Sequence, residues 1–149
     1  MTQKNDASSS GIVSDAPARE ASLRSYTQAE YKADLKKTIE QQGLYDFVAD
    51  CIAEIASLTI QLPLRQYTYI QNTLIKIREN VAQAVVDADN RTCVDAHELQ
   101  EMISSYGDKI FMWSRDLGYL DHMYIGELLT SMELAIKIGL QNAHETKNG

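Results

Sequence analysis

The sequence predicts an all-α fold, an antiparallel bundle of about five helices behind a disordered N-terminal tail. Apolar residues recur at spacings of three and four along most of the chain, which is the period of an amphipathic helix. Alternating β-branched runs and Asn-Gly or Asp-Gly hairpin turns are lacking. The apolar stripes are joined by short polar segments, which favours antiparallel neighbours.

The chain divides into a central domain and two polar ends. Residues 1–26 are rich in Ser, Ala and Asp, have no net charge and show no apolar period, so we expect a disordered tail. Residues 27–142 carry the stripes and form the predicted bundle. Residues 143–149 are polar, and we expect a second disordered tail there.

The first two predicted helices meet at a glycine. Thr27-Gln-Ala-Glu30 has the capping-box pattern, so a helix begins there, and Gly43 is placed to end it in the left-handed conformation. A second, more apolar stripe runs from Leu44 to Pro63. Cys51 lies on that stripe, and we interpret it as a core residue.

Three further helices follow. The segment 64–88 has a heptad seam, and its members are Tyr67, Ile70, Leu74, Ile77, Val81, Ala84 and Ala88. A fourth stripe runs from Leu99 to Leu117, before Gly118. A fifth runs from Ile125 to Ile136, and we expect its helix to end near Gly139.

Charge and composition exclude several function classes. The chain has 149 residues, 14 basic and 21 acidic side chains, and a net charge of −7, which disfavours nucleic acid and anionic membranes as partners. The longest apolar stretch, 52–64, is too short to span a membrane, and the N-terminus has no apolar signal segment, so we expect a cytoplasmic protein. Catalytic motifs such as a P-loop or GxSxG are lacking, so we expect no enzyme.

The acidic segment 87–98 resembles an EF-hand calcium loop. Position by position, the resemblance implies as ligands Asp87, Asp89, the Cys93 carbonyl, Asp95 and Glu98. We expect no cofactor, with Ca²⁺ as the alternative that this resemblance implies.

The same segment also has a simpler interpretation. Arg91 stands where the loop has an oxygen ligand, and Thr92 replaces its turn glycine. Asp95-Ala-His-Glu98 is itself a helix N-cap pattern. Between Glu79 and Glu101 six acidic residues accompany a single base, so the segment also forms an acidic region at one end of the bundle.

Two predicted helices carry more apolar surface than one seam needs. The surplus residues are Tyr69 and Ile75 on the third helix and Phe111 and Met112 on the fourth. Such surplus is typical of a contact surface for a protein partner or for another copy of the chain. We therefore expect a non-enzymatic interaction module, a small adaptor, chaperone-like or structural subunit, which forms a homo-oligomer.

Two alternatives stay open. One is a calcium-responsive module built on residues 87–98. The other is a bundle that binds a small ligand in a pocket near Trp113 and Tyr106.

Overall fold

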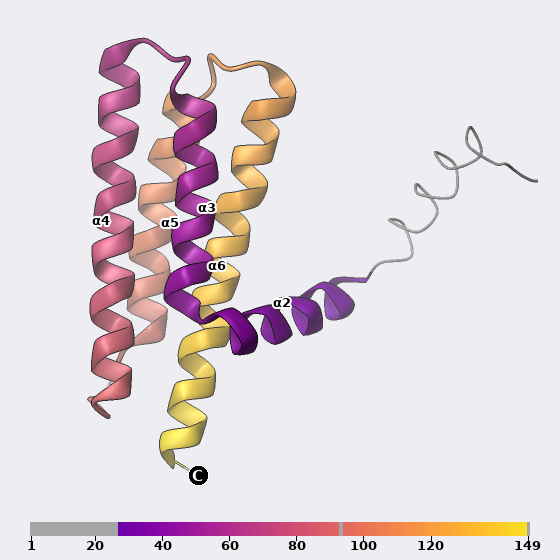
Figure 1. The fold of residues 1–149 in the computed structure, drawn as a ribbon, viewed down its shortest axis with the longest axis vertical. Helices are drawn as coiled ribbons and strands as arrows, with labels where there is room; N and C mark the ends of the chain where they lie inside the picture. The colour runs from indigo at the N-terminus through magenta and orange to yellow at the C-terminus, as the bar shows by residue number, and fades with distance from the viewer. Residues whose placement is uncertain (1–26, 93, 149) are drawn as a thin grey trace, which may run out of the picture. The chain divides into compact units, whose positions relative to one another are not determined.

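The computed structural model describes the backbone of residues 27–92 and 94–148, and the side chains of these ranges up to residue 140. The described residues form helices without any strand, which confirms the all-α prediction (Figure 1). The helices are α2 (Gln28–Gln42), α3 (Leu44–Thr59), α4 (Leu64–Asp89), α5 (Ala96–Trp113) and α6 (Tyr119–Asn148). The predicted N-terminal tail, 1–26, lies outside the described residues.

The chain divides into two units, one up to Leu35 and one from Lys36 onward, and the second contains the bundle α3–α6. In this bundle α3 packs against α4 and α6, and α5 packs against the same two helices. Consecutive helices run in opposite directions (Figure 1). The connections 60–63 and 114–118 therefore share one end, here called the apical end, and the connection 90–95 lies at the opposite, basal end.

Local signals set the helix boundaries at the start of the described chain. The Thr27 Oγ1 atom accepts a hydrogen bond from the Glu30 amide, and Glu30 Oε1 accepts one from the Thr27 amide, each at 3.1 Å. This is the predicted capping box. Gly43 has φ 97°, and its amide donates to Ile39 O at 2.8 Å. The positive φ of Gly43 ends α2, and α3 begins at the next position.

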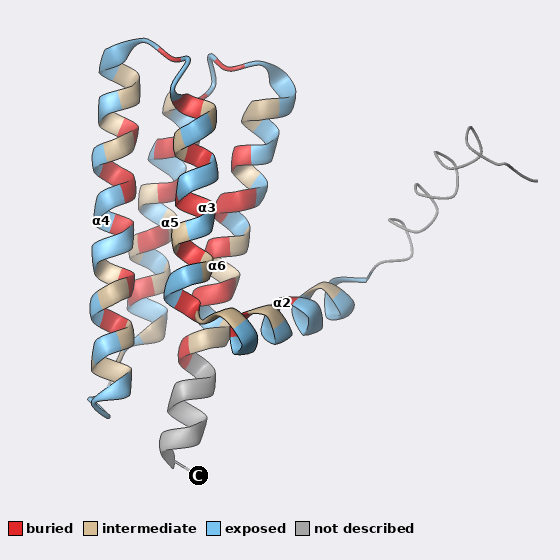
Figure 2. Cartoon of the chain, viewed as in Figure 1, coloured by how far each residue is buried: buried red, intermediate tan, exposed pale blue. Residues whose placement is uncertain are grey.

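The apolar stripes form the core of the bundle, and buried positions face its interior (Figure 2). The α4 seam is buried from Ile70 to Ala84, as the heptad pattern predicts, while Tyr67 and Ala88 at its ends are half-buried. Apolar side chains with 0 or 1% exposure come from all four helices: Val48, Ile55, Ile70, Leu74, Ile77, Val81, Ile103, Ile110, Ile125, Met132, Ala135 and Ile136.

The last helix differs from the prediction. We expected it to end near Gly139 and a tail to follow over 143–149, but α6 continues to Asn148. A Cβ atom added at Gly139 would lie 3.0 Å from Leu44 Cδ2. The glycine therefore allows close packing between α6 and the start of α3. This packing outweighs the cost of glycine inside a helix, which is about 1 kcal/mol relative to alanine.

Cys51 is 5% exposed, which confirms its core position. Burial raises the pKa of its thiol from 9.0 to about 12, with smaller effects from Glu54 and Asp50. Above pH 9 the unfolded chain releases this proton and the folded chain keeps it, so stability falls as pH rises from 9 toward 12.

We predict that the raised pKa of the Cys51 thiol lowers the free energy of unfolding by about 1 kcal/mol at pH 10 relative to neutral pH. Urea unfolding followed by circular dichroism at pH 7.5 and pH 10 measures the change. In Cys51→Ala this contribution disappears and the pH dependence becomes shallower. Equal pH dependence in both proteins would contradict the prediction.

Candidate functional site

The predicted calcium loop begins inside a helix. Asp87 and Asp89 lie in the last turn of α4, which ends at Asp89. Arg91 follows with φ 62°, a left-handed conformation that non-glycine residues rarely adopt. The Thr92 amide then donates to Asp87 O at 2.8 Å. The chain thus turns at Arg91, one position before the residue that replaces the EF-hand glycine.

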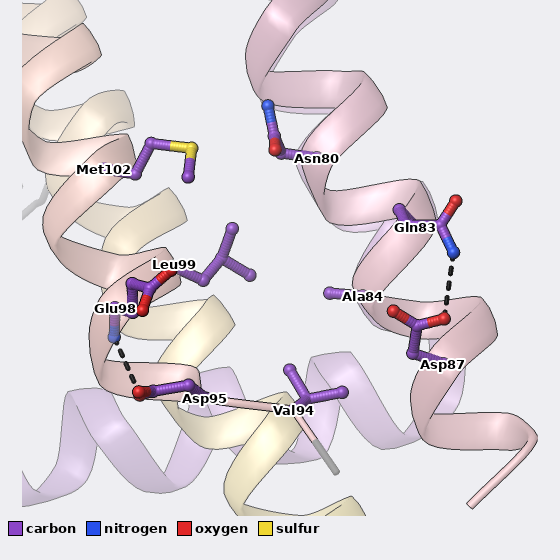
Figure 3. A pocket seen from close by; sticks show the side chains of 9 residues that line it. All are labelled: Asn80, Gln83, Ala84, Asp87, Val94, Asp95, Glu98, Leu99 and Met102. Carbon is purple, nitrogen blue, oxygen red and sulfur yellow. Dashed lines mark hydrogen bonds between the residues drawn. The ribbon is translucent and has the colours of Figure 1, made fainter. Parts of the chain in front are cut away.

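Three of the five predicted ligands line one pocket at the basal end, with a volume of about 220 Å³. Asp87 comes from α4, while Asp95 and Glu98 come from the start of α5, with Val94 between them in the view of Figure 3. Asp89 is exposed and is not among the lining residues. Cys93 lies outside the described residues.

Two of the three carboxylates in this pocket, those of Asp87 and Asp95, already accept hydrogen bonds from protein groups. Gln83 Nε2 donates to Asp87 Oδ1 at 2.9 Å, and the Glu98 amide donates to Asp95 Oδ1 at 2.9 Å (Figure 3). Asp95 is therefore the N-cap of α5, as its sequence pattern predicts. Over the described ranges, no group of three or more His, Cys, Asp or Glu side chains is arranged to hold a metal ion.

The apical end is built by two connections that are tied to each other. Gln66 Nε2 donates to Asp116 Oδ2 at 2.9 Å, and Gln61 Nε2 donates to Asp121 Oδ2 at 3.4 Å. Each connection also buries one leucine, Leu62 or Leu117, which appears as a red segment in each loop (Figure 2). The apical loops are thus fixed on the core by both apolar and polar contacts.

Six large apolar side chains are nevertheless exposed at or beside this end. Their exposed fractions are 68% for Ile60, 78% for Leu64, 55% for Met112, 75% for Tyr119, 79% for Leu120 and 43% for Met123. We call these six residues the apical patch. Large exposed apolar groups that gather in one place on a protein surface mark interaction sites.

The four predicted interface residues lie in different environments. Met112 belongs to the apical patch, and Ile75 is 41% exposed in the middle of α4. Tyr69 is half-buried and stacks on Trp113, with ring centroids 4.6 Å apart. Phe111 is half-buried and stacks on His122 at 3.9 Å. Tyr69 and Phe111 therefore make contacts within the bundle.

A small pocket of about 190 Å³ lies beside the patch, and its lining residues are Gln66, Met112, Trp113 and Arg115. Trp113 lines it as expected, but Tyr106 does not. Its volume is below the ~300 Å³ at which ligand pockets usually begin. It suits a single side chain better than a drug-sized molecule.

Neither a protein-family model, nor a curated protein, nor a solved structure matches the chain. Among the helices of the described residues, none combines the length and the apolar character needed to cross a membrane.

The Asp95 cap can be tested by substitution. Asp95→Ala removes the acceptor for the Glu98 amide and should lower the unfolding free energy by about 1 kcal/mol in urea denaturation. Asp95→Asn keeps an acceptor oxygen and should retain most of the stability. Equal losses in the two variants would show that charge, rather than the cap hydrogen bond, stabilises the start of α5.

Proposed function

We propose that this chain is a non-enzymatic protein–protein interaction module that binds its partner through the apical patch. The observation that carries the proposal is the exposure of six large apolar side chains on loops and helix ends that are otherwise well fixed. A rigid surface loses little conformational entropy when it binds, so its apolar contacts contribute more fully to affinity. Adaptors and structural subunits work through surfaces of this kind.

The chemistry elsewhere agrees with a binding role. A nucleophilic cysteine needs a lowered pKa, whereas burial raises the pKa of Cys51. The net charge of −7 disfavours nucleic acid as the partner. The raised pKa of Cys51 disfavours a nucleophilic role for this residue, and the net charge favours protein over nucleic acid as the binding target.

Photo-crosslinking at the patch tests the proposal for any protein partner. A photoreactive residue at position 120, introduced into the full chain in the cells that express it, should give a discrete crosslinked product. The same photoreactive residue introduced at position 72 is the control, because this position is exposed on α4 away from the patch. We expect Leu64→Asp to suppress the product at position 120. Equal yields at the two positions, or none at position 120, would contradict the proposal.

A calcium-responsive module is the second candidate, because Asp87, Asp95 and Glu98 share one pocket. Asp87 and Asp95 each accept one hydrogen bond, from Gln83 and from the Glu98 amide, and each keeps further acceptor positions that Ca²⁺ would use. Calorimetry on chelator-stripped protein tests it. Heat that saturates near one ion per chain and is lost in Glu98→Gln would establish this candidate, whereas an absence of saturable heat would remove it.

A further inference from the structure

The two ends of the bundle differ in charge. Around the apical patch, Arg65 and Arg115 balance Asp116 and Asp121. At the basal end, the segment from Glu79 to Glu101 carries a single base, Arg91, and six acidic residues, which are Glu79, Asp87, Asp89, Asp95, Glu98 and Glu101. The apical end is thus locally neutral and apolar, on a chain whose net charge is −7.

We propose that the occupant of the apical patch is a second copy of this chain, bound apex to apex about a two-fold axis. The proposal rests on the proposed function of the apical patch and specifies a second copy of the chain as the partner. In a two-fold contact the same surface is used by both copies, so it must be complementary to itself. An apolar patch whose neighbours in the chain include two arginines and two aspartates can meet this condition, if each arginine faces an aspartate of the other copy.

The arrangement of the apical charges fits such a contact. Asp116 and Asp121 accept hydrogen bonds from glutamine amides of their own chain. A carboxylate has several acceptor positions, so each aspartate keeps capacity for an arginine of the other copy. Arg65 and Arg115 are both exposed and can supply these bonds across the axis.

Long-range electrostatics favour the same geometry. The 26 residues of α4 span about 39 Å at 1.5 Å per residue. An apex-to-apex dimer therefore separates the two acidic basal ends by on the order of 80 Å, against a screening length of about 8 Å at physiological salt. A parallel side-by-side dimer would instead place the acidic segments of two negatively charged chains close together.

The patch is less suited to an amphipathic helix from another protein. Such a helix needs a continuous groove that accepts residues at positions i, i+3, i+4 and i+7. The pocket beside the patch holds about 190 Å³, which is room for a single side chain. The exposed apolar residues sit at the ends of all four bundle helices, and a second bundle end can cover them together.

Light scattering and sedimentation velocity on the purified full chain test the dimer. We expect twice the chain mass of 16.7 kDa at high concentration, with reversible dissociation on dilution. Leu120→Asp should weaken association at least about 100-fold, because the change enters a two-fold interface twice. Ile75→Asp is the matched control on an exposed residue away from the apical end, and it should leave association unchanged. Circular dichroism and thermal unfolding check that both variants fold.

A cysteine scan tests the orientation in a Cys93→Ser background. Leu120→Cys should form an intermolecular disulfide on mild oxidation, because the proposed contact brings position 120 of both copies together at the apical end. Glu98→Cys at the basal end should not. A strictly monomeric chain, or a dimer that crosslinks through Glu98→Cys, overturns the proposal.

The outcomes separate the dimer from the broader function. If the purified chain is monomeric but position 120 crosslinks to a different protein in cells, the second copy is excluded and the interaction module stands. If position 120 gives no crosslink and the chain is monomeric, both proposals fail.

Discussion

The structure depends on the removal of one apolar stripe per helix from water. The α4 seam shows the constraint most clearly, since Ile70, Leu74, Ile77 and Val81 have at most 1% exposure. A seam on a straight helix can be buried along its length only if neighbouring helices run alongside it. That requirement sets the side-by-side packing of α3–α6. The short connections then make consecutive helices antiparallel and fix the position of the helix ends.

The features that local chemistry decides could be predicted from the sequence. Thr27, Gly43 and Asp95 form caps because a side-chain oxygen or a missing Cβ acts within one turn of the helix. The buried stripes could be predicted because periodicity alone specifies which face of a helix leaves water. Neither inference requires knowledge of which helices are neighbours.

Features that depend on the neighbours could not be predicted. Gly139 resembles a helix end until the side chain of Leu44 is known to occupy the space beside it. Phe111 lies off the seam of α5. Its ring nevertheless stacks on His122 and packs against Gly126 within the bundle. Conversely, Leu64, Tyr119 and Leu120 flank loops and belong to no stripe, so periodicity gave no reason to single them out.

A single apolar end on an acidic body also limits the size of an assembly. A head-to-tail contact would join the neutral apical end of one chain to the acidic basal end of the next, and it would leave a free end for further growth. A two-fold contact uses both apical patches at once and leaves only acidic ends exposed, which repel one another. In the proposed dimer, the charge asymmetry that permits association at the apical end therefore also limits the assembly to two chains.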